Sequence, residues 1–170
     1  MIRSLVALCA LAGSTAATVA PPASYAGNWT LDTARSSGLP SYYSRVKSHK
    51  LTIAQTPEKL DVHVIVDAGM DAPDKIDFSY LLDGSEVSSE TFIRGPGGMM
   101  PVPTKLRALP SANGGIDITV SRHITMGPQP FDAVTTEAWQ LADDGKTLIV
   151  HRIDDSPMGH VDAKMFFTRS

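Results

Sequence analysis

The chain has 170 residues, of which 42% are hydrophobic and 19% are charged. This apolar share is normal for a globular domain and excludes wholesale disorder, and the length suits one domain, or two at most. The formal net charge of −3 provides no basic footprint for nucleic acid or for an anionic membrane surface, so we expect neither as a partner.

The first twenty residues have the order of a secretory signal peptide. Arg3 supplies a basic start, residues 5–12 form an apolar run, and Thr18-Val19-Ala20 supplies small residues before a proline pair. The run is shorter than the roughly 18 residues of a membrane span, and no second run follows. We expect cleavage after residue 20, one domain over residues 21–170, and a secreted, periplasmic protein. A buried N-terminal helix is the alternative.

Apolar and polar residues alternate with a period of two along residues 21–170. In residues 60–66, for example, leucine and valine at even positions alternate with aspartate, histidine and isoleucine. Turn sequences such as Asp83-Gly84 and Asn113-Gly114 separate the runs. The pattern predicts about ten strands, at residues 27–32, 50–55, 60–67, 75–82, 87–94, 103–109, 115–126, 133–141, 146–153 and 161–168.

Strands that follow one another through short turns pair antiparallel, and closing the sheet removes exposed edges. The sequence therefore predicts an all-β fold, an antiparallel up-and-down β-barrel of about 8–10 strands. A β-sandwich is the alternative. Only residues 33–49 break the alternation, and Pro40–Lys47 is predicted to form one or two helical turns with Pro40 in the first turn.

The first predicted strand begins Gly27-Asn28-Trp29, and a short helical segment and a strand meander follow it. This arrangement resembles the lipocalin and fatty-acid-binding superfamily. Residues 137–148 are similar to a segment of uncharacterised secreted bacterial lipocalin-like proteins. The resemblance implies a barrel with an interior cavity, in which Trp29 closes the base and an arginine near the last strand, here Arg169, packs across it. It implies no activity.

Four polar residues fall on the apolar faces of predicted strands: Arg122, Arg152, Tyr80 and Glu137. A guanidinium group offers a planar fork of donors that fits a carboxylate. We therefore expect these residues to hold the head group of a small lipophilic or amphipathic ligand, with its tail along apolar walls. The layout is similar to the interior Arg and Tyr site of fatty-acid-binding proteins. In the alternative, the arginines lie at strand ends and pair with Glu137 or reach solvent.

Two further functions remain open. The sequence contains no motif that indicates a cofactor, a metal or a catalytic residue, so we expect none of these. An enzyme would use His63, His123 or His151 with a nearby carboxylate. A cell-envelope interaction module would act through Met99 and Met100, which we place in a loop at the barrel mouth. In the simpler alternative, these methionines tuck against the barrel.

Overall fold

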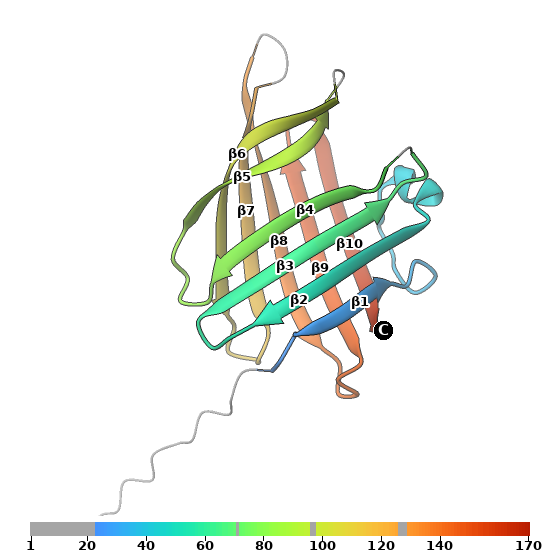
Figure 1. Ribbon diagram of the computed structural model, residues 1–170, viewed down its shortest axis with the longest axis vertical. Helices are drawn as coiled ribbons and strands as arrows, with labels where there is room; N and C mark the ends of the chain where they lie inside the picture. Colours follow the sequence, from blue (N-terminus) through green and yellow to red (C-terminus); the bar gives the residue numbers. More distant parts are fainter. Residues whose placement is uncertain (1–22, 71, 96–97, 126–128) are drawn as a thin grey trace, which may run out of the picture.

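The computed structural model describes residues 23–70, 72–95, 98–125 and 129–170, so the expected signal peptide at residues 1–20 lies outside the described residues. The described ranges form ten strands and one short helix (Figure 1). Each predicted strand corresponds to one observed strand, which confirms the all-β class. In chain order the strands are β1 Gly27–Leu31, β2 Ser48–Gln55, β3 Lys59–Asp67, β4 Asp74–Leu81, β5 Val87–Gly95, β6 Gly98–Pro110, β7 Ile116–Ile124, β8 Phe131–Leu141, β9 Thr147–Ser156 and β10 Gly159–Arg169.

One antiparallel sheet curls into a nearly closed up-and-down barrel, with the strand order β4-β3-β2-β1-β10-β9-β8-β7-β6-β5. Figure 1 shows β2–β4 crossing in front of β7–β9. The two end strands of this order, β4 and β5, lie against each other, and β4 also contacts β6. We call this junction the seam. The barrel prediction is confirmed, and the sandwich alternative is wrong because the sheet does not divide into two layers.

The period-two alternation decides which side chains enter the barrel. In β7, Ile118 and Val120 are almost completely buried, whereas Asp117, on the opposite face of the strand, is exposed. In β3, Leu60 and Val62 are buried while Lys59 is exposed. Successive Cβ atoms of a strand point to opposite faces, so burial of the apolar set fixes the register of every strand.

The base of the barrel, where the β2–β3, β6–β7 and β8–β9 turns lie, is closed by Tyr25 and Trp29. Trp29 is 1% exposed, and its indole N–H donates to the Tyr25 carbonyl at 2.9 Å. The Arg169 guanidinium lies 4.5 Å from the centre of a Trp29 ring and donates to the Ala26 carbonyl at 2.9 Å. A Cβ atom at Gly27, whose φ is +137°, would lie 3.2 Å from Arg169 Nη1, so the close approach suits glycine.

The predicted helical segment is a 3-10 helix, η1, over Ser41–Arg45. Pro40 precedes this helix with an extended backbone instead of occupying its first turn. The helix places the Tyr43 side chain against the barrel interior, where its hydroxyl contacts His49. Within the described ranges, no helix has the length and apolar character needed to cross a membrane.

Met99 and Met100 were predicted to lie in a loop, but both belong to strand β6. They pair with Arg94 and Ile93 of β5, while the pairing of β6 with β7 begins only at Thr104. Residues 98–103 therefore form an edge segment, which among the described residues pairs with β5 on one side only. Proline is tolerated at such an edge, since the missing N–H costs no hydrogen bond there.

Candidate functional site

A cavity of about 620 Å³ occupies the barrel interior. Its lining comes from η1, from β2–β4 and from β7–β10, and it reaches the end of the barrel formed by η1 and the β3–β4 turn, which we call the mouth. The structure brings all four predicted site residues to this cavity: Tyr80, Arg122, Glu137 and Arg152. A volume of this size is within the usual range of small-molecule sites.

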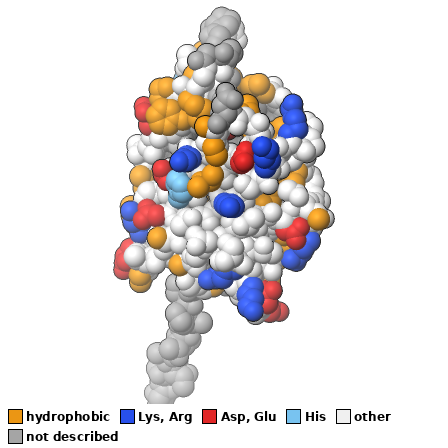
Figure 2. All heavy atoms as spheres, turned by 45° about the vertical axis from the view of Figure 1, so that its right-hand side comes forward, with side chains coloured by type: hydrophobic (Ala, Val, Ile, Leu, Met, Phe, Trp, Pro, Cys, Tyr) orange, Lys and Arg blue, Asp and Glu red, His pale blue; other side chains and the backbone are white. Residues whose placement is uncertain are grey.

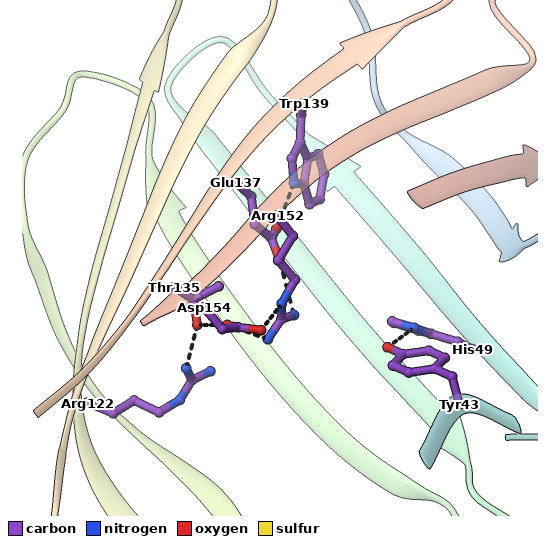
Figure 3. A network of polar contacts seen from close by, with 8 residues as sticks. All are labelled: Tyr43, His49, Arg122, Thr135, Glu137, Trp139, Arg152 and Asp154. Carbon is purple, nitrogen blue, oxygen red and sulfur yellow. Dashed lines mark hydrogen bonds and ion pairs between the residues drawn. The ribbon is translucent and has the colours of Figure 1, made fainter. Parts of the chain in front are cut away.

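A chain of polar contacts runs across the inner faces of β7, β8 and β9 (Figure 3). Arg152 donates from Nε and Nη2 to the two carboxylate oxygens of Asp154, at 2.8 and 3.0 Å, and from Nη1 to Glu137 at 3.3 Å. Glu137 also accepts a 2.7 Å hydrogen bond from the Trp139 indole. The Thr135 hydroxyl donates to Asp154 at 2.6 Å. Arg152, Glu137 and Asp154 are thus joined in one network of ion pairs and hydrogen bonds.

Arg152 is already neutralised by protein groups. Burial alone would lower the pKa of Arg152, but the neighbouring carboxylates Glu137 and Asp154 raise it above its ordinary value. Burial likewise opposes ionisation of Asp154, and its hydrogen bonds from Arg152 still lower its pKa. The sequence alternative in which Arg152 pairs with Glu137 therefore describes the observed contact, and Asp154 adds to it.

Arg122 is the less satisfied cation. Its Nη1 donates to the Thr135 hydroxyl at 3.2 Å. Among the described residues, no carboxylate lies within 4.0 Å of its guanidinium nitrogens. Burial lowers the pKa of Arg122, and the like charge of Arg152 lowers it further. The remaining N–H groups of Arg122 are available to a group inside the cavity.

Tyr80 reaches the same cavity from β4. Its residue surface is 3% exposed, and its hydroxyl forms no hydrogen bond within the described part of the chain. No described side-chain oxygen or nitrogen is fully buried without a partner, so this hydroxyl must retain accessible surface in the cavity. Burial, followed by the Glu137 charge, raises the pKa of Tyr80, which keeps the phenol neutral as a donor.

One interior histidine was not predicted from the sequence. His49 is 6% exposed, and its Nδ1 lies 3.1 Å from the Tyr43 hydroxyl under η1. Its ring meets Phe167 edge to face at 5.2 Å between centroids. Burial, assisted by the Arg152 charge, lowers the pKa of His49 from 6.5 to about 4. Extending the alternation of Leu51 and Ile53 back by one step would have placed His49 on the inner face.

The three histidines considered for catalysis lie on the outer wall, on three different strands. His63 contacts Asp77, His123 contacts Asp132 at 2.8 Å, and His151 contacts Asp162 at 2.7 Å. All three are exposed or half-buried and are not among the residues that line the main cavity. The described residues contain no group of three or more His, Cys, Asp or Glu side chains arranged to hold a metal ion.

Large hydrophobic side chains are exposed around the mouth. Figure 2, in which the η1 side of the barrel comes forward, shows hydrophobic side chains gathered in the upper half of that face. Met99 is 43% exposed and belongs to the outer surface of β6. Neither Met99 nor Met100 is among the described residues that line the cavity. The other large exposed hydrophobic residues of the mouth and its flanking strands are Tyr42, Met70, Phe92, Val134 and Met158.

Comparisons of the chain with protein-family models, with curated proteins and with solved structures found no match. The interpretation of the site therefore depends on its own geometry.

Proposed function

We propose that this protein binds a small amphipathic molecule with an anionic group, without covalent chemistry, inside the barrel. The observation that carries this proposal is the incomplete satisfaction of Arg122. Even partial burial of a guanidinium is costly unless it is paired, and the half-buried Arg122 has one hydrogen bond to a neutral hydroxyl. An anion bound at Arg122 and at the nearby Tyr80 hydroxyl would supply the missing partner.

The rest of the cavity supports the lipophilic part of such a ligand. Val62, Val64, Ile76, Phe78 and Met165 line it and offer hydrocarbon surface. Burial of ligand hydrocarbon there contributes roughly 25 cal/mol for each Å² removed from water. A secreted, periplasmic, lipocalin-like carrier is the specific form of the proposal. It is supported by the signal-like first twenty residues and by the Gly27-Asn28-Trp29 opening.

The test uses the purified protein and a fluorescent fatty-acid analogue, with native mass spectrometry to detect a co-purified ligand. Arg122→Gln should weaken binding of the anionic analogue about tenfold, the size expected when one charge-assisted hydrogen bond is lost. It should leave binding of the corresponding methyl ester unchanged. Lys50→Gln is the matched control, since it removes one positive charge from the exposed face of β2.

Two results would contradict the proposal. The first is a folded protein that binds neither analogue and carries no ligand in native mass spectrometry. The second is an equal loss of affinity for the anionic analogue in Arg122→Gln and in Lys50→Gln, because the effect would then come from net charge and not from the cavity.

A further inference from the structure

The cavity has two chemically different walls that face each other. In the strand order, β3 and β8 are half the circumference apart, and so are β4 and β9. The wall formed by β3 and β4 presents mainly hydrocarbon, from Val62, Val64, Val66, Ile76 and Phe78, and its polar members are Asp74 and Tyr80. The wall formed by β7, β8 and β9 presents a charged and hydrogen-bonded set, from Arg122, Thr135, Glu137 and Arg152, beside Val120, Trp139 and Val150.

The polar groups of the second wall form a stripe and not a single spot. The contacts run from the Trp139 indole through Glu137 and Arg152 to Asp154, and then through Thr135 to Arg122 (Figure 3). They cross three neighbouring strands. A ligand that fills the cavity therefore lies against polar groups along much of its length on this side.

The stripe retains donors along that length. A guanidinium has five N–H donors. Arg152 uses Nε and one hydrogen on each terminal nitrogen for Glu137 and Asp154, which leaves one N–H on each of Nη1 and Nη2 among the contacts of the described residues. Arg122 uses one N–H for Thr135. Acceptors placed at several points along a ligand could be satisfied here.

A straight-chain amphiphile matches this wall poorly. Its oxygens are all at one end, so its methylene groups would cover the remaining guanidinium and carboxylate groups of the stripe. Those groups would lose water and gain no hydrogen bond, which is unfavourable. A molecule with oxygens along one face and hydrocarbon on the opposite face avoids this loss and still buries apolar surface against β3 and β4.

From these two walls we infer that the ligand is facially amphipathic, such as a hydroxylated fused-ring acid with its oxygens on one face. The inference rests on the proposed function and specifies its ligand class. The oxygenated face lies against the β7–β9 stripe, with the carboxylate at Arg122. The hydrocarbon face lies against Val62, Val64 and Phe78.

A pair of isomers tests the inference directly. Chenodeoxycholate carries both ring hydroxyls on one face, whereas ursodeoxycholate has the same formula and charge but carries one hydroxyl on each face. Isothermal titration calorimetry below their micelle concentrations should give chenodeoxycholate about tenfold tighter binding, equal to roughly 1.4 kcal/mol. Dodecanoate serves as the straight-chain monoanion and should bind more weakly than chenodeoxycholate.

The outcomes separate the inference from the proposed function. Equal affinity for the two isomers, or tightest binding of dodecanoate, overturns the facial assignment and leaves a binding protein for anionic amphiphiles. Absence of binding by all three compounds to the folded protein overturns the facial assignment and also counts against the proposed function. A preference for chenodeoxycholate, together with weaker binding of both isomers by Arg122→Gln and unchanged binding by Lys50→Gln, supports the inference.

Discussion

Two arginines of this barrel show how the same side chain serves two purposes. At the base, Arg169 lies over the Trp29 ring and donates to backbone carbonyls, so fixed protein groups stabilise its charge. In the cavity, Arg122 has one hydrogen bond to a neutral hydroxyl and lies beside a second cation. A satisfied arginine contributes to stability, whereas an under-satisfied one indicates a place for a partner.

The largest expected effect separates the base from the cavity. Trp29→Ala should lower the free energy of unfolding by about 3–5 kcal/mol, because it removes a fully buried aromatic ring and leaves a void. Chemical denaturation followed by circular dichroism measures this change. Trp29→Phe is the control and should cost less. A loss below about 1 kcal/mol in Trp29→Ala would contradict the structural role of the base.

The second effect concerns the interior histidine. The pKa of His49 is lowered from 6.5 to about 4 in the folded protein, so the unfolded chain binds more protons between these values. The stability contribution is complete above pH 6.5 and is lost as the pH falls toward 4. The loss amounts to about 3 kcal/mol. Unfolding curves should lose this pH dependence in His49→Phe and keep it in His63→Gln, which alters an outer-wall histidine.

A third, smaller effect tests the pairing of Arg152. Arg152→Met leaves Glu137 and Asp154 without their cation, and it should cost about 2 kcal/mol. This is less than for a fully buried pair, because 32% of the Arg152 side chain is accessible. Arg152→Lys keeps the charge and should cost less. If Arg152→Met unfolds at the same denaturant concentration as the wild type, the network does not stabilise the fold.

The smallest effect returns to the two arginines. Arg169→Gln should lower the free energy of unfolding by about 1 kcal/mol through loss of its cation–π contact and hydrogen bonds. Arg122→Gln should change it by less than about 0.5 kcal/mol, because the lost hydrogen bond is offset by relief from the Arg152 charge. Thermal unfolding of both variants measures the difference. A larger loss of stability in Arg122→Gln than in Arg169→Gln would contradict the structural role of Arg169 and the binding role of Arg122.

Much of the fold could be predicted because it depends on local signals. Alternation and turn residues located every strand, and counting in twos placed Arg122, Arg152, Tyr80 and Glu137 on inner faces. The β6 strand was predicted too short, since prolines argue against a ladder unless the strand is known to be an edge. Whether residues 98–103 form an edge depends on where β7 begins to pair with β6, and a local sequence pattern does not show this.

The difference between Arg122 and Arg152 could not be predicted in the same way. Both arginines occupy equivalent positions in alternating runs. Whether their guanidinium groups find hydrogen-bond and ion-pair partners depends on residues that the fold brings next to them. Asp154, which neutralises Arg152, lies just beyond the predicted strand at residues 146–153, whereas β9 continues to Ser156. Tyr43 and His49 meet only because η1 folds over the mouth, and this contact depends on tertiary packing.

The seam between β4 and β5 is where we expect the barrel wall to widen most easily. Every other neighbouring pair of strands is joined by a backbone ladder of hydrogen bonds, whereas these two strands lie at the two ends of the hydrogen-bonded order. A small separation of these two strands breaks no backbone ladder within the described residues. We therefore expect the wall to widen around a bulky ligand at a lower free-energy cost here than elsewhere. Amide hydrogens on the outer edges of β4 and β5 should accordingly exchange with deuterium faster than those of β9 and β10.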